Sequence, residues 1–232
     1  METSSFPDRR LLLGLLGLST VTGVVDAASY LGLGNVFTAN MTGNVVFLAF
    51  ALAGAPGLSA PRCAIALVGF LTGALVGGRV AAAMRSGTRY RGAATGFAAE
   101  AALLLTAAAV AIGYPASHAG HSTQLYTVIG VTAVAMGIRN ATVRSLGVPD
   151  MTTTVLTLTL TGLAADSTLA GGGNPRWPRR VASVVAMAGG AAGGVLLLRQ
   201  SLALPLAVCA CLTGTCALTV RLLQRVGLAT RA

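Results

Sequence analysis

Runs of about twenty apolar residues alternate with brief polar breaks along the whole chain, a pattern typical of a polytopic membrane protein. A helix needs roughly 20 apolar residues to cross a bilayer. Eight segments approach this length: residues 10–31, 36–57, 61–84, 92–114, 123–147, 150–171, 179–199 and 202–224. Because these segments use up the chain, the pattern predicts an all-α transmembrane bundle forming one integral membrane domain over residues 1–232.

Two of these segments are weaker than the others. Residues 36–57 and 150–171 are rich in Asn and Thr. If they do not cross, the bundle has six spans, and one or both segments are broken or re-entrant helices. Such backbone is tolerated at membrane depth only where it is buried in protein or lines a cavity. We favour eight spans and keep six as the alternative.

Composition and charge agree with the membrane class. Only 9% of residues are charged and 54% are apolar, with a mean hydropathy of +0.77, whereas soluble domains have about 25% charged residues. The net charge of +10 comes from arginine alone. These arginines stand at the ends of apolar segments, as snorkelling and topology-setting charges do. The charge therefore gives no support for nucleic-acid binding.

Two features bear on topology. With eight spans, nine arginines fall on the side of the termini and six on the other, which favours cytoplasmic termini by the positive-inside rule. Arg9 and Arg10 before an apolar run resemble a cleavable signal. Because the run extends to Val25 and continues into the next segment, we interpret it as a retained first transmembrane helix.

Four charged residues fall inside the expected spans: Asp26, Glu100, Arg139 and Asp166. Ionisable groups at membrane depth are costly and usually pair or serve a function. We therefore expect Arg139 to pair with Asp26 or Glu100. One interpretation is a static ion pair that pins two helices. The other is a central cavity in which Asp26 or Glu100 binds a coupling proton or cation, or Arg139 binds an anion.

Small polar side chains form a second candidate set. They are Asn40, Thr42 and Asn44 in the first half of the chain, and Asn140, Thr154 and Thr157 in the second. A threonine hydroxyl can bond back to the carbonyl four residues earlier and satisfy itself. Asparagine cannot do so as easily, so Asn40 and Asn44 are the better candidates for ligand or interhelix hydrogen bonds.

An internal repeat relates residues 19–84 to residues 133–199. TGVVDA at 22–27 aligns with MGIRNA at 136–141, and each copy continues through a Thr/Asn-rich helix start to a glycine-rich helix. The copies are parallel if four spans separate them and inverted if the count is six or seven. Such repeats commonly place a binding site at their interface. The glycines at 69, 73 and 77, and at 189, 190, 193 and 194, indicate close helix packing.

Other chemistry finds little support. The four cysteines lie in or beside apolar runs, as packing residues do. His118 and His121 have H-x-x-H spacing but no third metal ligand nearby. No nucleophile with an adjacent base and no nucleotide-binding loop is visible. We therefore expect no enzyme, no cofactor and no metal site.

The motif G-x-x-D-A-x-S-Y-L…V-F-x-A-N-M-T-G-N at Gly23–Asn44, followed by M-G-x-R-N-A at Met136–Ala141 and T-T-x-V-L-T, resembles the YoaK-like family of bacterial multi-pass inner-membrane proteins. The resemblance covers essentially the whole chain. It implies a bacterial cytoplasmic-membrane location and about six transmembrane segments, and it implies no established substrate.

These observations predict a secondary or passive transporter for a small solute, with Asp26, Asn40, Thr42 and Asn44 facing Arg139, Asn140, Thr154 and Thr157. The alternative is a non-transporting sensor or assembly factor that docks partner helices on its glycine faces. A channel ranks third, because Arg139 would have to stay out of the pore. The expected partners are the lipid bilayer and a small molecule or ion of unknown identity, and assembly into a homo-oligomer stays open.

Overall fold

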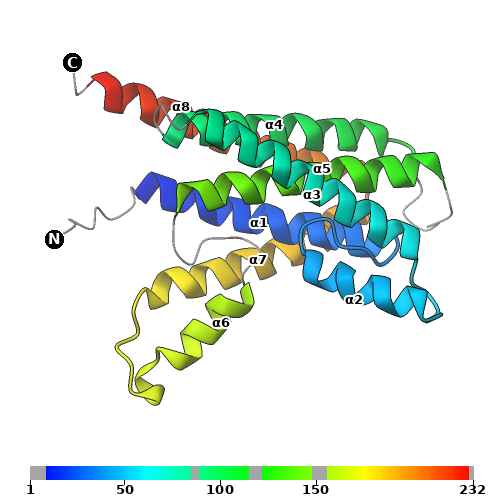
Figure 1. Cartoon of the computed structure of the whole chain (residues 1–232). Coiled ribbons are helices and arrows are strands. Elements are labelled where there is room, and N and C mark those ends of the chain that lie inside the picture. The colour runs from blue at the N-terminus through cyan, green and yellow to red at the C-terminus, as the bar shows by residue number, and fades with distance from the viewer. Residues whose placement is uncertain (1–8, 85–88, 115–121, 148–155, 230–232) are drawn as a thin grey trace.

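A computed structural model of the chain describes residues 9–84, 89–114, 122–147 and 156–229, which form eight α-helices and one 3₁₀ turn. Six helices are long: α1 (Arg9–Gly32), α3 (Ala60–Ala83), α4 (Arg89–Val110), α5 (Thr123–Leu146), α7 (Trp177–Leu198) and α8 (Ala203–Ala229). The shorter elements are α2 (Met41–Leu52), α6 (Leu156–Ala165) and η1 (Thr168–Ala170). The long helices lie side by side and alternate in direction, so α1 begins and α8 ends at the same end of the bundle (Figure 1).

Five of the described helices, α1, α3, α4, α7 and α8, are long and apolar enough to cross a membrane. Helix α5 is of similar length, with 24 residues, but it lies inside the bundle and every residue from Ala135 to Arg139 is buried. Helices α2 and α6 have 12 and 10 residues, which at 1.5 Å per residue span about 18 and 15 Å of a bilayer core of about 30 Å. The preferred count of eight crossings is therefore not supported among the described residues, where the two Asn/Thr-rich segments contribute helices of about half the length of a span.

Helix α1 ends in a backbone turn that sends the chain back into the bundle. Gly34 and Asn35 adopt positive φ values of 83° and 57°, and the Asn35 N–H donates to the Tyr30 carbonyl at 2.9 Å, as in a Schellman-type helix end. The Asn35 side-chain amide then donates to the Gly57 carbonyl at 3.1 Å. The chain between these two contacts therefore leaves one end of the bundle and returns to it.

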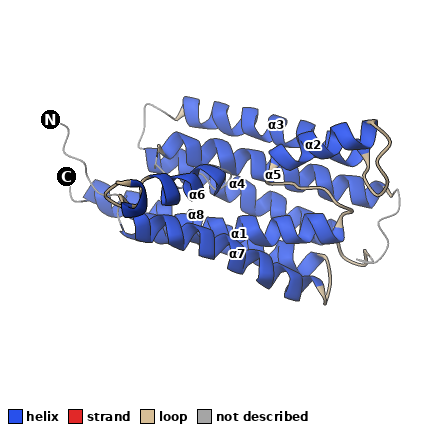
Figure 2. Cartoon of the chain, turned by 90° about the horizontal axis from the view of Figure 1, so that it is seen from below, coloured by secondary structure: helices blue, strands red, loops and turns tan. Residues whose placement is uncertain are grey.

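Residues 33–40, which connect α1 to α2, form a loop that enters the bundle, and we call it the re-entrant loop. Val36, Thr38 and Ala39 are fully buried. Ala39 packs in a core cluster that includes Leu104 of α4 and Met136 of α5. Since this backbone is enclosed by protein, it meets the condition for irregular structure at membrane depth. Helix α2 then runs outward along α3, to the end of the bundle opposite α6 (Figure 2).

Glycines allow two pairs of long helices to touch backbone to backbone. A Cβ atom at Gly73 of α3 would lie 2.1 Å from the Val134 carbonyl oxygen of α5. A Cβ atom at Gly190 of α7 would lie equally close, 2.1 Å, to the Thr20 carbonyl oxygen of α1. Gly73 and Gly190 of the expected close-packing faces are thus used inside the molecule, where α3 packs on α5 and α7 packs on α1.

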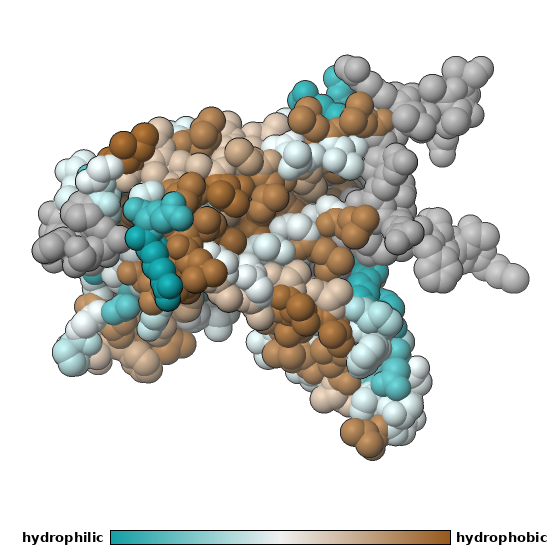
Figure 3. Space-filling model, turned by 180° about the vertical axis from the view of Figure 1, so that it is seen from behind, coloured by the Kyte–Doolittle hydropathy of each residue, from teal (hydrophilic) through white to brown (hydrophobic). Residues whose placement is uncertain are grey.

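The outer surface of the bundle is apolar along much of its length (Figure 3). Leu71 and Leu75 of α3 are 65% and 58% exposed, and Leu218 of α8 is 61% exposed. On a soluble monomer, such a continuous surface would be unusual. It fits contact with lipid, and the polar groups of interest are gathered inside.

Candidate functional site

The centre of the bundle contains a buried ion pair between Arg139 of α5 and Glu100 of α4, both fully inaccessible. The Arg139 Nε donates to Glu100 Oε1 at 2.7 Å, and Nη2 donates to the same oxygen. Nη1 donates to the Leu18 carbonyl at 3.1 Å and to Thr22 Oγ1 at 2.9 Å, both on α1. The prediction that Arg139 pairs with Asp26 or Glu100 is confirmed for Glu100.

Glu100 connects the pair to a fourth helix. Thr213 Oγ1 of α8 donates to Glu100 Oε1 at 3.2 Å. Helices α1, α4, α5 and α8 are thus joined by polar contacts at one level of the bundle. Glu100 Oε2, however, has no hydrogen-bond partner among the described residues. The network is therefore a buried polar centre with one carboxylate oxygen left for another donor.

Asp26 forms a second polar contact, close to the first. The Asn40 amide donates to Asp26 Oδ2, while Oδ1 has no hydrogen-bond partner in the described part of the chain. Asp26 is only 7% exposed. It lies six residues before the end of α1, which places it about 9 Å inside that end. The charge of Arg139 acts on the Asp26 carboxyl, although the two side chains form no ion pair.

The start of helix α2 is part of this second contact. Asn40 stands at the N-cap position but makes no side-chain cap hydrogen bond, because its amide is turned to Asp26. The first N–H groups of a helix have no partner inside the helix and give its N-terminus a partial positive charge. Asp26 therefore lies beside the N-terminal turn of a half-helix that begins inside the bundle.

Asn44 and Thr42 have different surroundings from Asn40. Asn44 is fully buried, and its Oδ1 accepts from the Phe37 N–H at 2.9 Å while its Nδ2 donates to the Phe37 carbonyl. Its amide thus holds the re-entrant loop in place. Phe37 also stacks on Tyr30 and Phe47, with ring centroids 5.1 and 5.8 Å away. Thr42 is exposed on the first turn of α2.

Of the candidates from the second half, Arg139 lies at this centre, and the small polar residues have other surroundings in the part of the chain that the structure describes. The Asn140 amide donates to the Met136 carbonyl of its own helix at 2.9 Å. Thr157 is exposed at the start of α6. Thr154 lies outside the described residues, as do His118 and His121. The joint set of eight ligand-binding groups therefore stays a prediction.

The prediction that Asp166 lies inside a transmembrane span is wrong. Asp166 does not lie within a span but follows α6, with its side chain 44% exposed. Its Oδ2 accepts from Arg180 Nη1 of α7 at 2.7 Å, and the same nitrogen donates to the Gly162 carbonyl at 2.7 Å. Asp166 thus ties α6 to α7 away from the central network, because the helix expected to contain it stops one residue earlier.

Several polar residues of the centre were not singled out from the sequence. Thr22 lies four residues before Asp26 on the same face of α1, a spacing that could have identified it. Thr213 had no such signal, since it stands in a long apolar segment. The buried hydroxyls of Thr38 and Thr132 have no hydrogen-bond partner among the described residues.

Comparison with known proteins places the chain in a family. The family model described as a protein of unknown function, DUF1275, matches residues 14–219. The chain belongs to the DUF1275 family. A relative is the UPF0700 transmembrane protein YoaK of Bacillus subtilis (strain 168), which is 34% identical over 158 residues that cover 68% of this chain and 67% of the relative. No solved structure matches. The family resemblance drawn from the sequence is confirmed, and this DUF1275 member is a multi-pass membrane protein in contact with the bilayer.

Proposed function

We propose that this DUF1275 protein is a secondary or passive permease for a small solute or ion in the bacterial cytoplasmic membrane. The observation behind the proposal is that half-helix α2 begins inside the bundle, with its N-terminal turn beside Asp26. Discontinuous helices of this kind commonly form substrate and ion sites in secondary transporters. An unpartnered carboxylate oxygen at such a point supplies the acceptor that a bound cation, proton or solute donor requires.

Asp26 is a better candidate than Glu100 for the proton- or cation-binding acid. Glu100 faces the guanidinium of Arg139, which compensates its charge. Asp26 forms no ion pair: it interacts with the Asn40 amide and with the backbone N–H groups of Ala39 and Asn40, and Arg139 acts on it without direct contact. A carboxylate at membrane depth without an ion-pair partner can be neutralised by a proton or by an external cation. A proton that enters and leaves Asp26 with the solute would couple transport to the proton gradient.

We further propose that the site lies between two halves, residues 19–84 and 133–199, related as an inverted repeat. Helices α1 and α5 run in opposite directions, and α2 and α6 leave the bundle toward opposite ends (Figures 1 and 2). Gly23 and Gly137, which align in the repeat, meet the same environment: a Cβ atom would lie 2.1 Å from the Met187 carbonyl oxygen in one case and from that of Phe70 in the other. Opposite helix directions are incompatible with the parallel repeat that eight crossings would give.

The second candidate function is a sensor or assembly factor that docks partner helices on glycine faces. The glycines at 73, 77, 190 and 194 are occupied by helices of the same molecule. A docking surface would therefore depend on Gly78, Gly189 and Gly193, at which an added Cβ atom meets nothing within 4 Å. Purification as a stable heteromeric complex, without any ligand-dependent change, would favour this candidate.

The orientation of the chain follows from how arginines divide between the two ends of the bundle. Positions at the end where α1 begins are Arg9, Arg10, Arg79, Arg89, Arg91, Arg144, Arg176, Arg179, Arg180, Arg221 and Arg225. At the other end, among the described residues, stand Arg62 and Arg199. This division is more one-sided than the nine against six expected with eight crossings. By the positive-inside rule, we propose that the arginine-rich end faces the cytoplasm.

Cysteine labelling tests this orientation. In a variant with the four native cysteines replaced by alanine, Pro56→Cys lies in the exposed link between α2 and α3, and Gly173→Cys lies in the exposed link before α7. A membrane-impermeant maleimide should label Pro56→Cys in intact cells and Gly173→Cys only after permeabilisation. The reverse pattern would show that the arginine-rich end faces outward.

A ligand screen tests the permease itself. Thermal unfolding of the purified protein in detergent would be measured across a panel of metabolites and ions at two pH values. A ligand present at about 100 times its dissociation constant stabilises a protein by roughly 2.7 kcal/mol, which is readily detected. We expect the hit to be transported in proteoliposomes, and Asp26→Asn to abolish both the stabilisation and the transport while the variant remains folded.

The matched control is Asp166→Asn, which removes a carboxylate outside the central network. It should keep ligand binding and transport. If no compound in a broad panel binds, and Asp26→Asn lowers stability without any other effect, the buried polar groups are structural and the permease proposal fails.

A further inference from the structure

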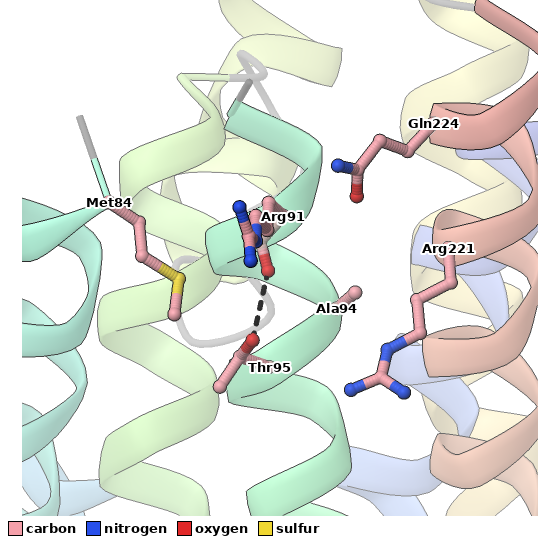
Figure 4. A pocket seen from close by; sticks show the side chains of 6 residues that line it. All are labelled: Met84, Arg91, Ala94, Thr95, Arg221 and Gln224. Atoms are coloured by element: carbon pink, nitrogen blue, oxygen red, sulfur yellow. Dashed lines mark hydrogen bonds between the residues drawn. The ribbon is translucent and has the colours of Figure 1, made fainter. Parts of the chain in front are cut away.

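A cavity of about 400 Å³ lies at the arginine-rich end, between the start of α4 and the last turns of α8 (Figure 4). Its lining residues are Met84, Arg91, Ala94, Thr95, Arg221 and Gln224. The side chains of Arg221 and Gln224 extend from α8 toward α4, from which Arg91 comes (Figure 4). Two guanidinium groups from facing helices therefore border one hollow.

The cavity is rich in hydrogen-bond donors and poor in acceptors. The ion pairs formed among the described residues use Arg139 and Arg180, and no described carboxylate contacts Arg91 or Arg221. The Thr95 hydroxyl donates to the Arg91 carbonyl, one turn earlier in α4, at 3.1 Å. Guanidinium groups match the geometry of phosphate oxygens and can donate to them in pairs. An anion with several acceptor oxygens would satisfy these donors.

The depth of the cavity in the membrane indicates which molecule would supply such an anion. Arg91 is the first residue of one candidate span, Arg91–Val110, and Arg221 is next to the last residue of another, Ala203–Leu222. Both therefore lie at the level where apolar surface gives way to the headgroup layer. Leu218 lies one turn deeper on the same face of α8 and is 61% exposed, so it presents apolar surface beneath the charges.

We propose that Arg91 and Arg221 clamp a phosphate group in this cavity, and that the phosphate belongs to the headgroup of an anionic phospholipid whose acyl chains lie along α8. Basic pockets between transmembrane helices at the cytoplasmic face bind anionic headgroups in this way. The site is separate from the central network, so the proposal does not depend on transport. Its consequence is that anionic lipid stabilises the contact between α4 and α8.

Native mass spectrometry of the delipidated full-length protein tests the proposal, with phosphatidylglycerol and phosphatidylcholine as probes. The protein should bind phosphatidylglycerol in preference to phosphatidylcholine. Arg91→Gln and Arg221→Gln should each weaken binding about tenfold, the scale of one charge-assisted contact. Arg91→Lys, which keeps the charge but loses the paired donors, should fall between. Arg199→Gln removes an exposed arginine at the opposite end and should bind as the unchanged protein does.

Inorganic phosphate distinguishes the two sources of the ligand. If millimolar phosphate leaves the lipid bound, the site recognises the lipid headgroup. If it displaces the lipid and binds with the same dependence on Arg91 and Arg221, the clamp accepts free phosphate, and the assignment to lipid is overturned. Unchanged lipid binding by the double variant Arg91→Gln with Arg221→Gln, or an equal loss in Arg199→Gln, would overturn the clamp altogether.

Discussion

Replacement of Arg139 by glutamine should destabilise the protein by about 3–5 kcal/mol, the range seen when one partner of a buried ion pair is removed. Arg139 and Glu100 are both fully inaccessible. Glutamine cannot neutralise the carboxylate, so Glu100 is left as an uncompensated charge inside the bundle. The shift would be measured as the change in unfolding midpoint of the purified protein in detergent.

The contacts around the pair explain why the effect should be large. Arg139 also donates to the Leu18 carbonyl and to Thr22 of α1, and Glu100 accepts from Thr213 of α8. Loss of the guanidinium therefore removes the polar link between α5 and both α1 and α4 at once. Unsatisfied polar groups in a water-poor interior each cost further free energy.

A double-mutant cycle separates the pair from its surroundings. Glu100→Gln alone should also destabilise the protein, because it leaves the guanidinium without its counter-charge. The double variant Arg139→Gln with Glu100→Gln should cost less than the sum of the single variants, since neither charge is then unpaired. Additive effects would show that the two side chains are not energetically coupled.

The ion pair between Arg180 and Asp166 is the matched control. It is partly exposed: the Asp166 side chain is 44% exposed, whereas the Arg180 side chain is 7% exposed. Water can solvate the position of Asp166, and Arg180 keeps its hydrogen bond to the Gly162 carbonyl when Asp166 is replaced. Asp166→Asn should therefore cost clearly less than Arg139→Gln, in which both partners are inaccessible, and an equal loss would contradict burial as the cause.

The sequence predicted the long helices well because their signal is local. Continuous apolar runs ended by glycine, proline or arginine define α3 and α7, whose Pro61 and Pro178 stand in the first turn as helix starts favour. The interpretation failed where composition and backbone conflict. Residues 36–57 are apolar enough on average to suggest a span, yet the positive φ values of Gly34 and Asn35 turn the chain inward, and a hydropathy window does not register such a turn.

The sequence also could not predict which helices pack against each other. The glycine faces predicted close packing, but they did not identify α5 as the partner of α3 or α1 as the partner of α7. Within the candidate site, the cost of burying a charge was enough to predict that Arg139 would pair. It could not show that Asn40 turns to Asp26 while Asn44, four residues later, binds the backbone of Phe37. That difference depends on the conformation of the re-entrant loop, which is a tertiary feature.

Substitution of Gly137 by alanine should destabilise the protein by about 3 kcal/mol or more, at the upper end of the costs of overpacking. The added Cβ atom would lie 2.1 Å from the Phe70 carbonyl oxygen and 2.7 Å from the Ala74 nitrogen. Both are backbone atoms of α3, so no side chain can rotate away to make room. Helix α3 would have to move off α5, which would weaken packing along the whole contact.

Gly193→Ala is the control for this substitution, because an added Cβ atom there meets nothing within 4 Å. Alanine is a better helix former than glycine by up to about 1 kcal/mol, so this variant should be unchanged or slightly more stable. Thermal unfolding of both variants in the same detergent gives the comparison. Equal stability of Gly137→Ala and Gly193→Ala would mean that α3 and α5 are not in backbone contact.

Gly23→Ala extends the same measurement to the other helix pair. Its Cβ atom would lie 2.1 Å from the Met187 carbonyl oxygen of α7, the counterpart of the contact at Gly137. If the two halves are related by an inverted repeat, the two substitutions should have similar costs, since each forces apart an equivalent pair of helices. A large cost at Gly137 with none at Gly23 would show that the two contacts are not equivalent and would remove the main support for the repeat. The permease proposal would then depend on the central polar groups alone.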